Sequence, residues 1–183
     1  MEGVAADKRG NKTVRDLALS MVVLGVVVFG IYLFVPHGNG KRDPVKTETV
    51  SYNVELEQAR RDAPYPVLGP TGLGARWRAT SVQYSGADRR NVTWHLGFVD
   101  PEEQYVALEQ TNGAAKAFAA QVTIGSHPDP GSGVAVAGAT WQHWSGGRYD
   151  ALVRTDKGVT TVVMGTAPQS QLVRLATSLR PTG

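Results

Sequence analysis

The sequence contains no cysteine, little lysine and no dense cluster of charge. Without cysteine the chain forms no disulfide and takes no cysteine-linked lipid, so a folded domain depends on its hydrophobic core. The 19 Lys and Arg residues outnumber the 16 Asp and Glu residues by three. The adjacent pairs Arg60–Arg61 and Arg89–Arg90 are too short to form the basic patch of a nucleic-acid-binding protein. We therefore expect no nucleic-acid partner.

Sequence motifs that specify a reaction are also missing. Residues 131–138 are glycine-rich, but the Gly-Lys-Ser/Thr of a phosphate-binding loop does not follow them. Ser132 lacks the G-x-S-x-G context of a nucleophile elbow. We therefore expect a protein without enzymatic activity and without a cofactor.

One long hydrophobic segment is present near the N-terminus. Residues 17–35 (LALSMVVLGVVVFGIYLFV) contain no charged side chain. As a helix they extend over ~28 Å, close to the ~30 Å hydrocarbon core of a bilayer. The segment is too long for the hydrophobic region of a signal peptide, and the sequence after it is a poor cleavage site. We interpret it as an uncleaved transmembrane helix that anchors the chain by a single span.

The charges around this segment predict its orientation. Basic residues are denser before it, at Lys8, Arg9, Lys12 and Arg15, than after it. That bias favours a cytoplasmic N-terminus. We expect a cytoplasmic tail (1–16), the transmembrane helix (17–35), a Gly/Pro/charged linker (36–49) and an extracytoplasmic domain (50–183), which together give a cell-membrane protein.

The C-terminal part has the pattern of an α+β domain with an antiparallel sheet. In residues 92–99, Trp94, Leu96 and Phe98 alternate onto one side, as in a strand with one buried face. Hairpin-sized turns separate most of the strands, which argues against a Rossmann-type fold. The sequence predicts about six strands, at residues 77–84, 92–99, 105–110, 139–145, 149–155 and 159–164.

Two main helices are expected to pack on this sheet. The first follows Thr111 or Asn112 and ends near Gly125. The second begins near Pro168 and has apolar residues at the spacing of one helix face, namely Leu172, Leu175, Ala176 and Leu179. The pattern also predicts a short helix at residues 55–62, an extended segment at 65–70 and a Pro/Gly loop at 126–138.

Several of these segments resemble one family. They are residues 94–101 (WHLGFVDP), 105–111 (YVALEQT), 149–154 (YDALVR), 159–167 (VTTVVMGTA) and the helix at 172–179. Together they resemble the actinobacterial DUF4245 proteins, a family of unknown function with an N-terminal membrane segment and an exported domain. The resemblance implies a membrane protein of an actinobacterium, and it implies no activity.

Residues 141–144 (WQHW) are the candidate binding surface. In a strand, Trp141 and His143 share one side of the sheet, and Trp144 lies on the other. Aromatic side chains of this kind could recognise a sugar or a peptide. The alternative is that one tryptophan packs in the core and the other shields the edge of the sheet.

Other polar residues are candidates for a metal or catalytic site. His127 could contribute to a metal site with Asp129, but two ligands are too few to define one, and we expect no metal. Glu102 and Glu103 are neighbours in one turn, whereas a glycosidase needs opposed carboxylates. Gln110 should lie at the border of a buried face, where its amide would join the strand end to the following helix.

The main functional hypothesis is a membrane-anchored extracytoplasmic module that binds an envelope protein or another component of the cell envelope. One alternative is an envelope hydrolase whose site assembles from dispersed residues, in particular His95, His127, His143, Glu102 and Glu103. The other alternative is an accessory subunit of a membrane complex.

Overall fold

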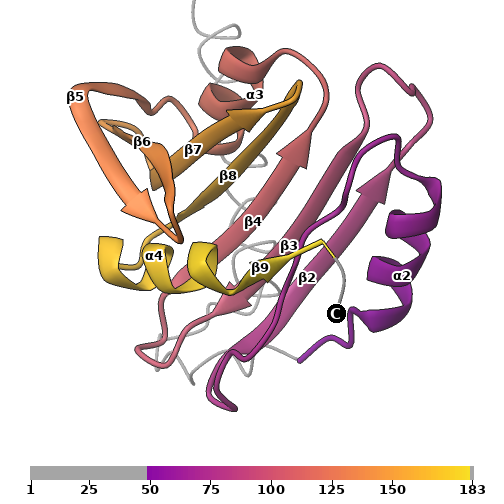
Figure 1. The fold of residues 1–183 in the computed structure, drawn as a ribbon. Helices are drawn as coiled ribbons and strands as arrows, with labels where there is room; N and C mark the ends of the chain where they lie inside the picture. Colours follow the sequence, from indigo (N-terminus) through magenta and orange to yellow (C-terminus); the bar gives the residue numbers. More distant parts are fainter. Residues whose placement is uncertain (1–48, 182–183) are drawn as a thin grey trace, which may run out of the picture. The chain divides into compact units, whose positions relative to one another are not determined.

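A computed structural model describes residues 49–181, which belong to one compact unit. Its main feature is an antiparallel sheet of seven strands in the order β2-β3-β4-β8-β7-β6-β5 (Figure 1). The strands are β2 (Arg78–Ser85), β3 (Thr93–Val99), β4 (Tyr105–Thr111), β5 (His127–Val136), β6 (Ala139–Ser145), β7 (Asp150–Asp156) and β8 (Val159–Gly165). The predicted α+β class with an antiparallel sheet is confirmed.

The topology consists of two meanders joined by a helix. Strands β2, β3 and β4 follow one another through turns, and the chain then passes through α3 (Ala115–Val122) to β5 at the far edge. Strands β5 to β8 return across the sheet until β8 pairs with β4. Short hairpin turns impose the antiparallel direction within each meander, since a parallel pair needs a longer crossover.

The prediction of about six strands is wrong by one, because residues 127–136 were expected to form a loop. They form the edge strand β5, whose pairing with β6 shifts register between Pro128 and Gly133. Proline lacks a backbone N–H and is accepted in a sheet only at an edge or a bulge. Both conditions hold for Pro128 and Pro130, which made this strand look like a loop in the sequence.

Three helices lie in the described residues, which correspond to the two main helices and the short helix that were predicted. The short helix predicted at 55–62 is α2 (Asn53–Asp62), which turns Leu56 and Ala59 inward. The last helix, α4 (Gln169–Ser178), begins directly after Pro168, and its Leu172 and Leu175 are buried as predicted.

The side of the sheet that includes Trp94, Leu96, Leu108 and Leu152, here called the front face, holds the larger core. Residues of α2 and α4 belong to the same core, and α4 crosses this face in Figure 1. Because side chains alternate along a strand, each of these strands places every second residue in this core. Trp94, Leu96 and Leu108 have no exposed surface, which confirms the predicted alternation in β3.

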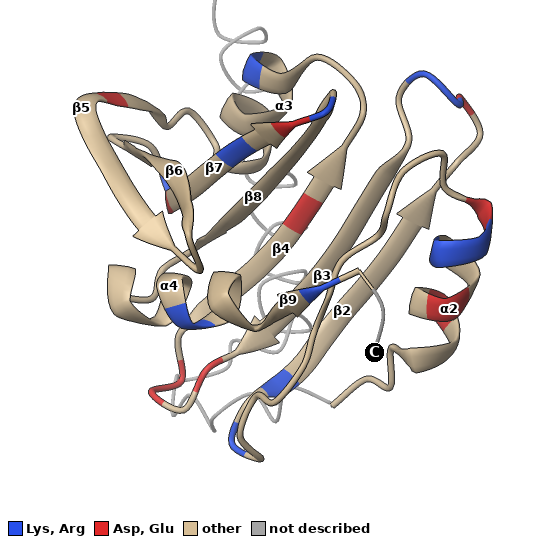
Figure 2. Cartoon of the chain, viewed as in Figure 1, with Lys and Arg blue, Asp and Glu red and all other residues tan. Residues whose placement is uncertain are grey.

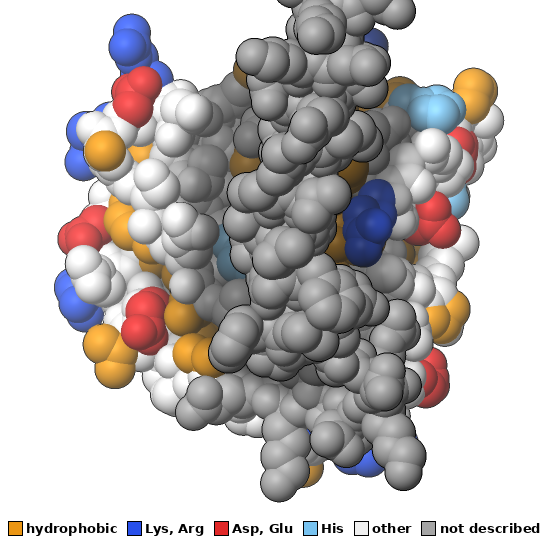
Figure 3. Space-filling view, turned by 180° about the vertical axis from the view of Figure 1, so that it is seen from behind, with side chains coloured by type: hydrophobic (Ala, Val, Ile, Leu, Met, Phe, Trp, Pro, Cys, Tyr) orange, Lys and Arg blue, Asp and Glu red, His pale blue; other side chains and the backbone are white. Residues whose placement is uncertain are grey.

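The other side, here called the rear face, has a smaller core. Ala107, Val162 and Met164 pack there with Ala119 of α3. Figure 3 views the molecule from this side, where hydrophobic, charged and histidine side chains are interspersed in the described part. The two faces therefore differ in how much apolar surface their strands contribute.

An extended segment crosses the front of the domain, as predicted for residues 65–70. Tyr65 and Val67 are buried, and Gly69–Pro70 forms the short strand β1, which pairs with β9 (Leu179–Arg180). Gln110 links this segment to the sheet: its Oε1 accepts a hydrogen bond from the Leu68 N–H at 2.7 Å. The expected link from Gln110 to the following helix is therefore wrong, because its side chain turns to the front face instead.

Charged residues lie mainly at turns and on α2 (Figure 2). Among the helices within residues 49–181, none has the length and hydrophobicity needed to cross a bilayer. The predicted tail (1–16), the transmembrane helix (17–35) and residues 36–48 of the linker lie outside the described residues.

Candidate functional site

The clearest irregularity of the sheet is a divergence between β6 and β7. These strands pair at only three positions, from Gln142 opposite Val153 to Trp144 opposite Ala151. Beyond Gln142, β6 stays paired with β5, and β7 stays paired with β8. Figure 1 shows the β5–β6 hairpin turning away from β7. We call this divergence the fork and define it by Thr140, Trp141, Arg154 and Thr155.

Two pockets meet at the fork. The first has a volume of ≈ 560 Å³ and includes all four fork residues, together with Asp129 and Gln142. The second, of ≈ 510 Å³, lies between the extended segment at Pro64–Leu68 and the turn that joins β7 to β8. Trp141 and Arg154 line both pockets. The fork thus lies at the junction of two hollows of the size that small ligands and peptide side chains occupy.

The fork offers hydrogen-bond donors of several kinds. Arg154 makes an ion pair with Asp156 through one nitrogen at 3.1 Å, and both side chains are substantially exposed. Exposed pairs of this kind are weak, at about 0–1 kcal/mol, and a guanidinium has five N–H donors. Arg154 is therefore available to a carboxylate or a carbonyl in either pocket, next to the indole of Trp141.

The predicted binding surface of Trp141, His143 and Trp144 is divided between the two faces. Trp141 is 5% exposed in the front core, and Trp144 is 4% exposed in the rear core. The two rings therefore do not form one exposed aromatic surface, because alternation along β6 sends them to opposite sides. Of the three residues, Trp141 lines the pockets at the fork.

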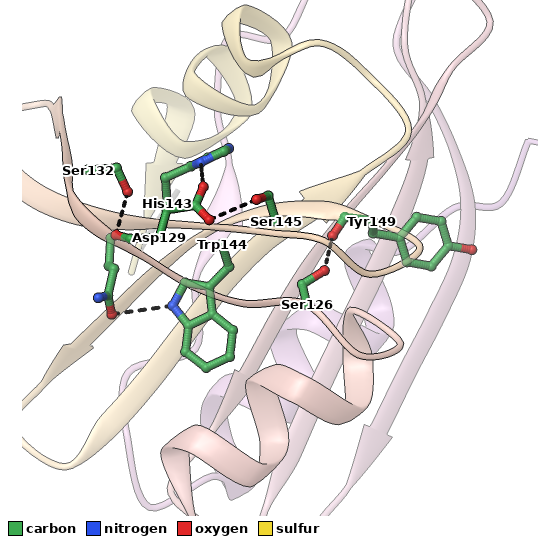
Figure 4. A network of polar contacts seen from close by, with 8 residues as sticks. Ser126, Asp129, Ser132, His143, Trp144, Ser145 and Tyr149 are labelled. Carbon is green, nitrogen blue, oxygen red and sulfur yellow. Dashed lines mark hydrogen bonds and ion pairs between the residues drawn. The ribbon is translucent and has the colours of Figure 1, made fainter.

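His143 belongs to a polar network that joins β6 to β5 (Figure 4). Its Nδ1 lies 2.6 Å from Asp129 Oδ2, and Ser145 Oγ donates to Asp129 Oδ1 at 2.8 Å. The Ser132 hydroxyl donates to the backbone carbonyl of Asp129 at 2.8 Å. The network fixes the irregular part of β5 beside the first pocket, which Asp129 and Ser132 line.

The same network stabilises the charge of Asp129. The hydrogen bond from Ser145, followed by the hydrogen bond and the charge of His143, holds the pKa of Asp129 below its ordinary value of 3.8. His127 contributes to this lowering through its charge. Since a carboxylate accepts but does not donate, Nδ1 of His143 is assigned as the protonated nitrogen.

The dispersed residues of the hydrolase hypothesis do not meet in one pocket of the described structure. His127 and His143 both act on Asp129, whereas His95 lies in β3 on the rear face. The two glutamates have separate partners, since Glu102 accepts from Gln171 and Glu103 pairs with Arg78. Within residues 49–181, no group of three His, Asp or Glu side chains is arranged to hold a metal ion.

Sequence analysis missed Arg154 and Thr155 as parts of the site. They lie in a regular-looking strand, and their position at the fork depends on where the pairing of β6 and β7 ends. The only signal was indirect: the glycine- and proline-rich residues 128–133 indicate irregular pairing on the neighbouring strand.

These observations define an α+β domain in residues 49–181, in which an incompletely paired antiparallel sheet presents two pockets that share Trp141 and Arg154. Residues 9–179 match the model of the family described as "Protein of unknown function (DUF4245)". The chain belongs to this DUF4245 family, which confirms the resemblance found in the sequence. Among the curated proteins, no match to the chain was found.

Proposed function

We propose that this protein is a membrane-anchored binding module whose exported domain holds a segment of an envelope protein at the fork. The observation that supports the proposal is the divergence of β6 from β7, which opens the junction of the two pockets. Binding at this position requires no catalytic group.

The fork suits an extended peptide. Where β6 and β7 separate, their facing edges no longer hydrogen-bond to each other, and unpaired strand edges accept an added strand. Main-chain hydrogen bonds would supply affinity, while pockets on alternate sides of the peptide would select side chains. Arg154 favours a peptide with a carboxylate near the fork, and Trp141 offers an apolar wall.

The membrane part of the proposal rests on residues 17–35 and the basic residues before them. The absence of cysteine allows a direct test, because one introduced cysteine is then the only thiol in the chain. We expect Ser85→Cys, an exposed position at the end of β2, to react with a membrane-impermeant maleimide in intact cells. Reaction only after lysis would contradict an extracytoplasmic domain.

The binding site is tested by site-specific photo-crosslinking of the full chain in cells. A photoreactive amino acid replaces Thr155 at the fork or, as a matched control, the exposed Asp88 in the turn between β2 and β3. We expect one protein to be crosslinked from position 155 and not from position 88. Its crosslinked peptide, identified by mass spectrometry, should be extended and contain an acidic residue.

A second variant tests the role of charge. Arg154→Glu should abolish the adduct, since it reverses the charge that favours a carboxylate. Equal adducts from positions 155 and 88, or an adduct that survives Arg154→Glu, would contradict binding at the fork. A partner retained by residues 1–40 alone would instead support the accessory-subunit alternative.

A further inference from the structure

Three polar residues form a hydrogen-bonded series on the rear face of the sheet, away from the front core. Ser81, His95 and Glu109 lie on the neighbouring strands β2, β3 and β4. Ser81 Oγ lies 2.7 Å from His95 Nε2, and His95 Nδ1 lies 2.6 Å from Glu109 Oε1. The acidic segment in the middle of β4 in Figure 2 is Glu109, the single acidic residue of that strand.

The proton positions follow from the partners. Glu109 is buried, and as a carboxylate it only accepts, so Nδ1 of His95 is assigned as its N–H donor. Nε2 then has a free lone pair and accepts the hydroxyl proton of Ser81. A histidine activates a serine nucleophile when its Nε2 is hydrogen-bonded to the serine hydroxyl and its Nδ1 is hydrogen-bonded to a carboxylate.

The backbone around Ser81 is adapted to this position. Gly97 lies opposite Ser81, and a Cβ at Gly97 would overlap the Ser81 Oγ atom. The register of β2 on β3 also shifts between Ala79 and Ser81, which is a β-bulge. Bulges redirect side chains and are frequent beside active sites. The hydroxyl thus occupies space that any residue other than glycine would fill.

A second Ser–His–carboxylate cluster in the same domain is connected differently. In the network of Asp129, the Ser145 hydroxyl donates to the carboxylate and not to the imidazole of His143. The imidazole of His143 is therefore not in position to take the proton of Ser145, so this cluster lacks the connection that activates a serine. The two clusters therefore provide an internal comparison, since each contains a serine, a histidine and a carboxylate but the three groups are connected differently.

The space beside His95 indicates the kind of substrate. A pocket of ≈ 280 Å³ is lined by His95 and Glu109, by the apolar Phe118 and Val122 of α3, and by uncharged polar residues. The lining in the described part contains no lysine or arginine that would bind an anionic group. Ser81 itself is outside this lining and borders the pocket through its hydrogen bond to His95. The pocket therefore suits a short, uncharged acyl group that extends past the imidazole from Ser81.

We propose that Ser81, His95 and Glu109 form an acyl-ester hydrolase site for short, uncharged acyl groups. Ser81 Oγ bonds to the ester carbonyl carbon while its proton moves to His95 Nε2. The bond from this carbon to the leaving oxygen then breaks, and His95 returns the proton to the departing alcohol. Water then bonds to the acyl carbon while His95 takes one of its protons, the bond from this carbon to Ser81 Oγ breaks, and His95 returns the proton to Ser81 as the acid leaves. Glu109 is a positioning residue that holds the imidazole.

The test uses the full chain in mild detergent and a fluorophosphonate probe. Ser81 Oγ forms a bond to phosphorus, fluoride leaves, and intact-mass and peptide-mass measurements locate the adduct. We expect one adduct on the peptide that contains Ser81, with hydrolysis of p-nitrophenyl acetate in the untreated protein. Ser81→Ala should abolish both, and His95→Asn should slow labelling by at least ~100-fold, the usual contribution of a general base.

Three variants separate activation from folding. Gly97→Ala keeps all three groups but displaces Ser81 Oγ, so it should also lose labelling while the protein keeps its circular dichroism spectrum. Glu109→Gln should remove the low-field NMR signal of the His95 Nδ1 proton. A general loss of packing would not affect this one signal specifically. Ser145→Ala, the matched control, should label as the wild type does.

Either of two results would overturn the proposal. The first is a wild-type protein that stays unlabelled while a reference serine esterase reacts in the same sample. The second is a His95→Asn variant that is labelled as fast as the wild type. Both concern the rear face, so they leave the crosslink from Thr155 at the fork to be judged separately.

Discussion

The amide of Gln110 is expected to be among the most important single side chains for the stability of this domain. It is 1% exposed, and its two polar ends join three parts of the fold. Its Oε1 accepts from Leu68 N–H at 2.7 Å in the extended segment, and its Nε2 donates to Thr161 Oγ1 at 3.3 Å in β8.

The substitution Gln110→Ala should lower the free energy of unfolding by about 2–4 kcal/mol. The partly buried Leu68 N–H loses its partner, which costs about 1–3 kcal/mol. The deleted side-chain atoms leave a cavity beside Tyr65 and Trp141 that adds about 1 kcal/mol. For a domain of this size the total corresponds to a melting temperature lower by roughly 6–20 °C.

Thr161→Ala is the matched comparison. It removes the weaker of the two bonds and should cost about 0.5–1.5 kcal/mol. The double variant should be less destabilised than the sum of the single variants, by a coupling of about 0.5–1.5 kcal/mol, since both remove the same bond.

Tryptophan fluorescence of the full chain is a suitable assay. All 4 tryptophans lie within the described domain, at positions 77, 94, 141 and 144. The indole of Trp94 donates to the Leu68 carbonyl at 3.1 Å, next to the bond under test. If Gln110→Ala lowered the free energy of unfolding by less than Thr161→Ala does, this reasoning would be refuted, because the hydrogen bond to Leu68 would then contribute little to stability.

Two further predictions concern backbone packing and charge. Gly165→Ala should cost more than about 3 kcal/mol, because the new Cβ would overlap the backbone carbonyl of Tyr105, whereas Gly74→Ala, in open surroundings, should stay within about 0.5 kcal/mol in the same unfolding assay. The lowered pKa of Asp129 means that its ionised form stabilises the fold above pH 3.8, and that this contribution is lost as the pH falls through the lower folded pKa. Asp129→Asn should therefore lose stability at neutral pH and show a weaker further loss on acidification, and an unchanged acid profile would contradict the role of the Ser145 bond.

Elements with strong local patterns were predictable from the sequence. Strand β3 alternates Trp94, Leu96 and Phe98 into the front core, and α4 places Leu172 and Leu175 on one helix face. In both cases the period of apolar residues matches the geometry of the element, so local information is sufficient.

Elements that depend on neighbouring strands were not predictable in the same way. Strand β5 contains two prolines and four further residues without strand propensity, and it exists because an edge position tolerates them. The fork is even harder to predict from local sequence, because its position depends on how many residues of β6 and β7 remain paired after the turn that joins them. No property of Arg154 or Thr155 in the sequence indicates where that pairing ends.

The hydrogen-bonded series of Ser81, His95 and Glu109 contains both a part that the sequence can predict and a part that it cannot. His95 and Glu109 lie at equal distances from Glu102 in the turn between β3 and β4, so a symmetrical hairpin alone would place them opposite each other, as they are. Ser81 cannot be placed by the same argument, because residues 86–92 form a longer connection that leaves the register of β2 on β3 open. A slip of one residue would turn Ser81 to the front face. A histidine–carboxylate pair could thus be predicted from the sequence, whereas the serine that would give it a reaction could be found only in the folded sheet.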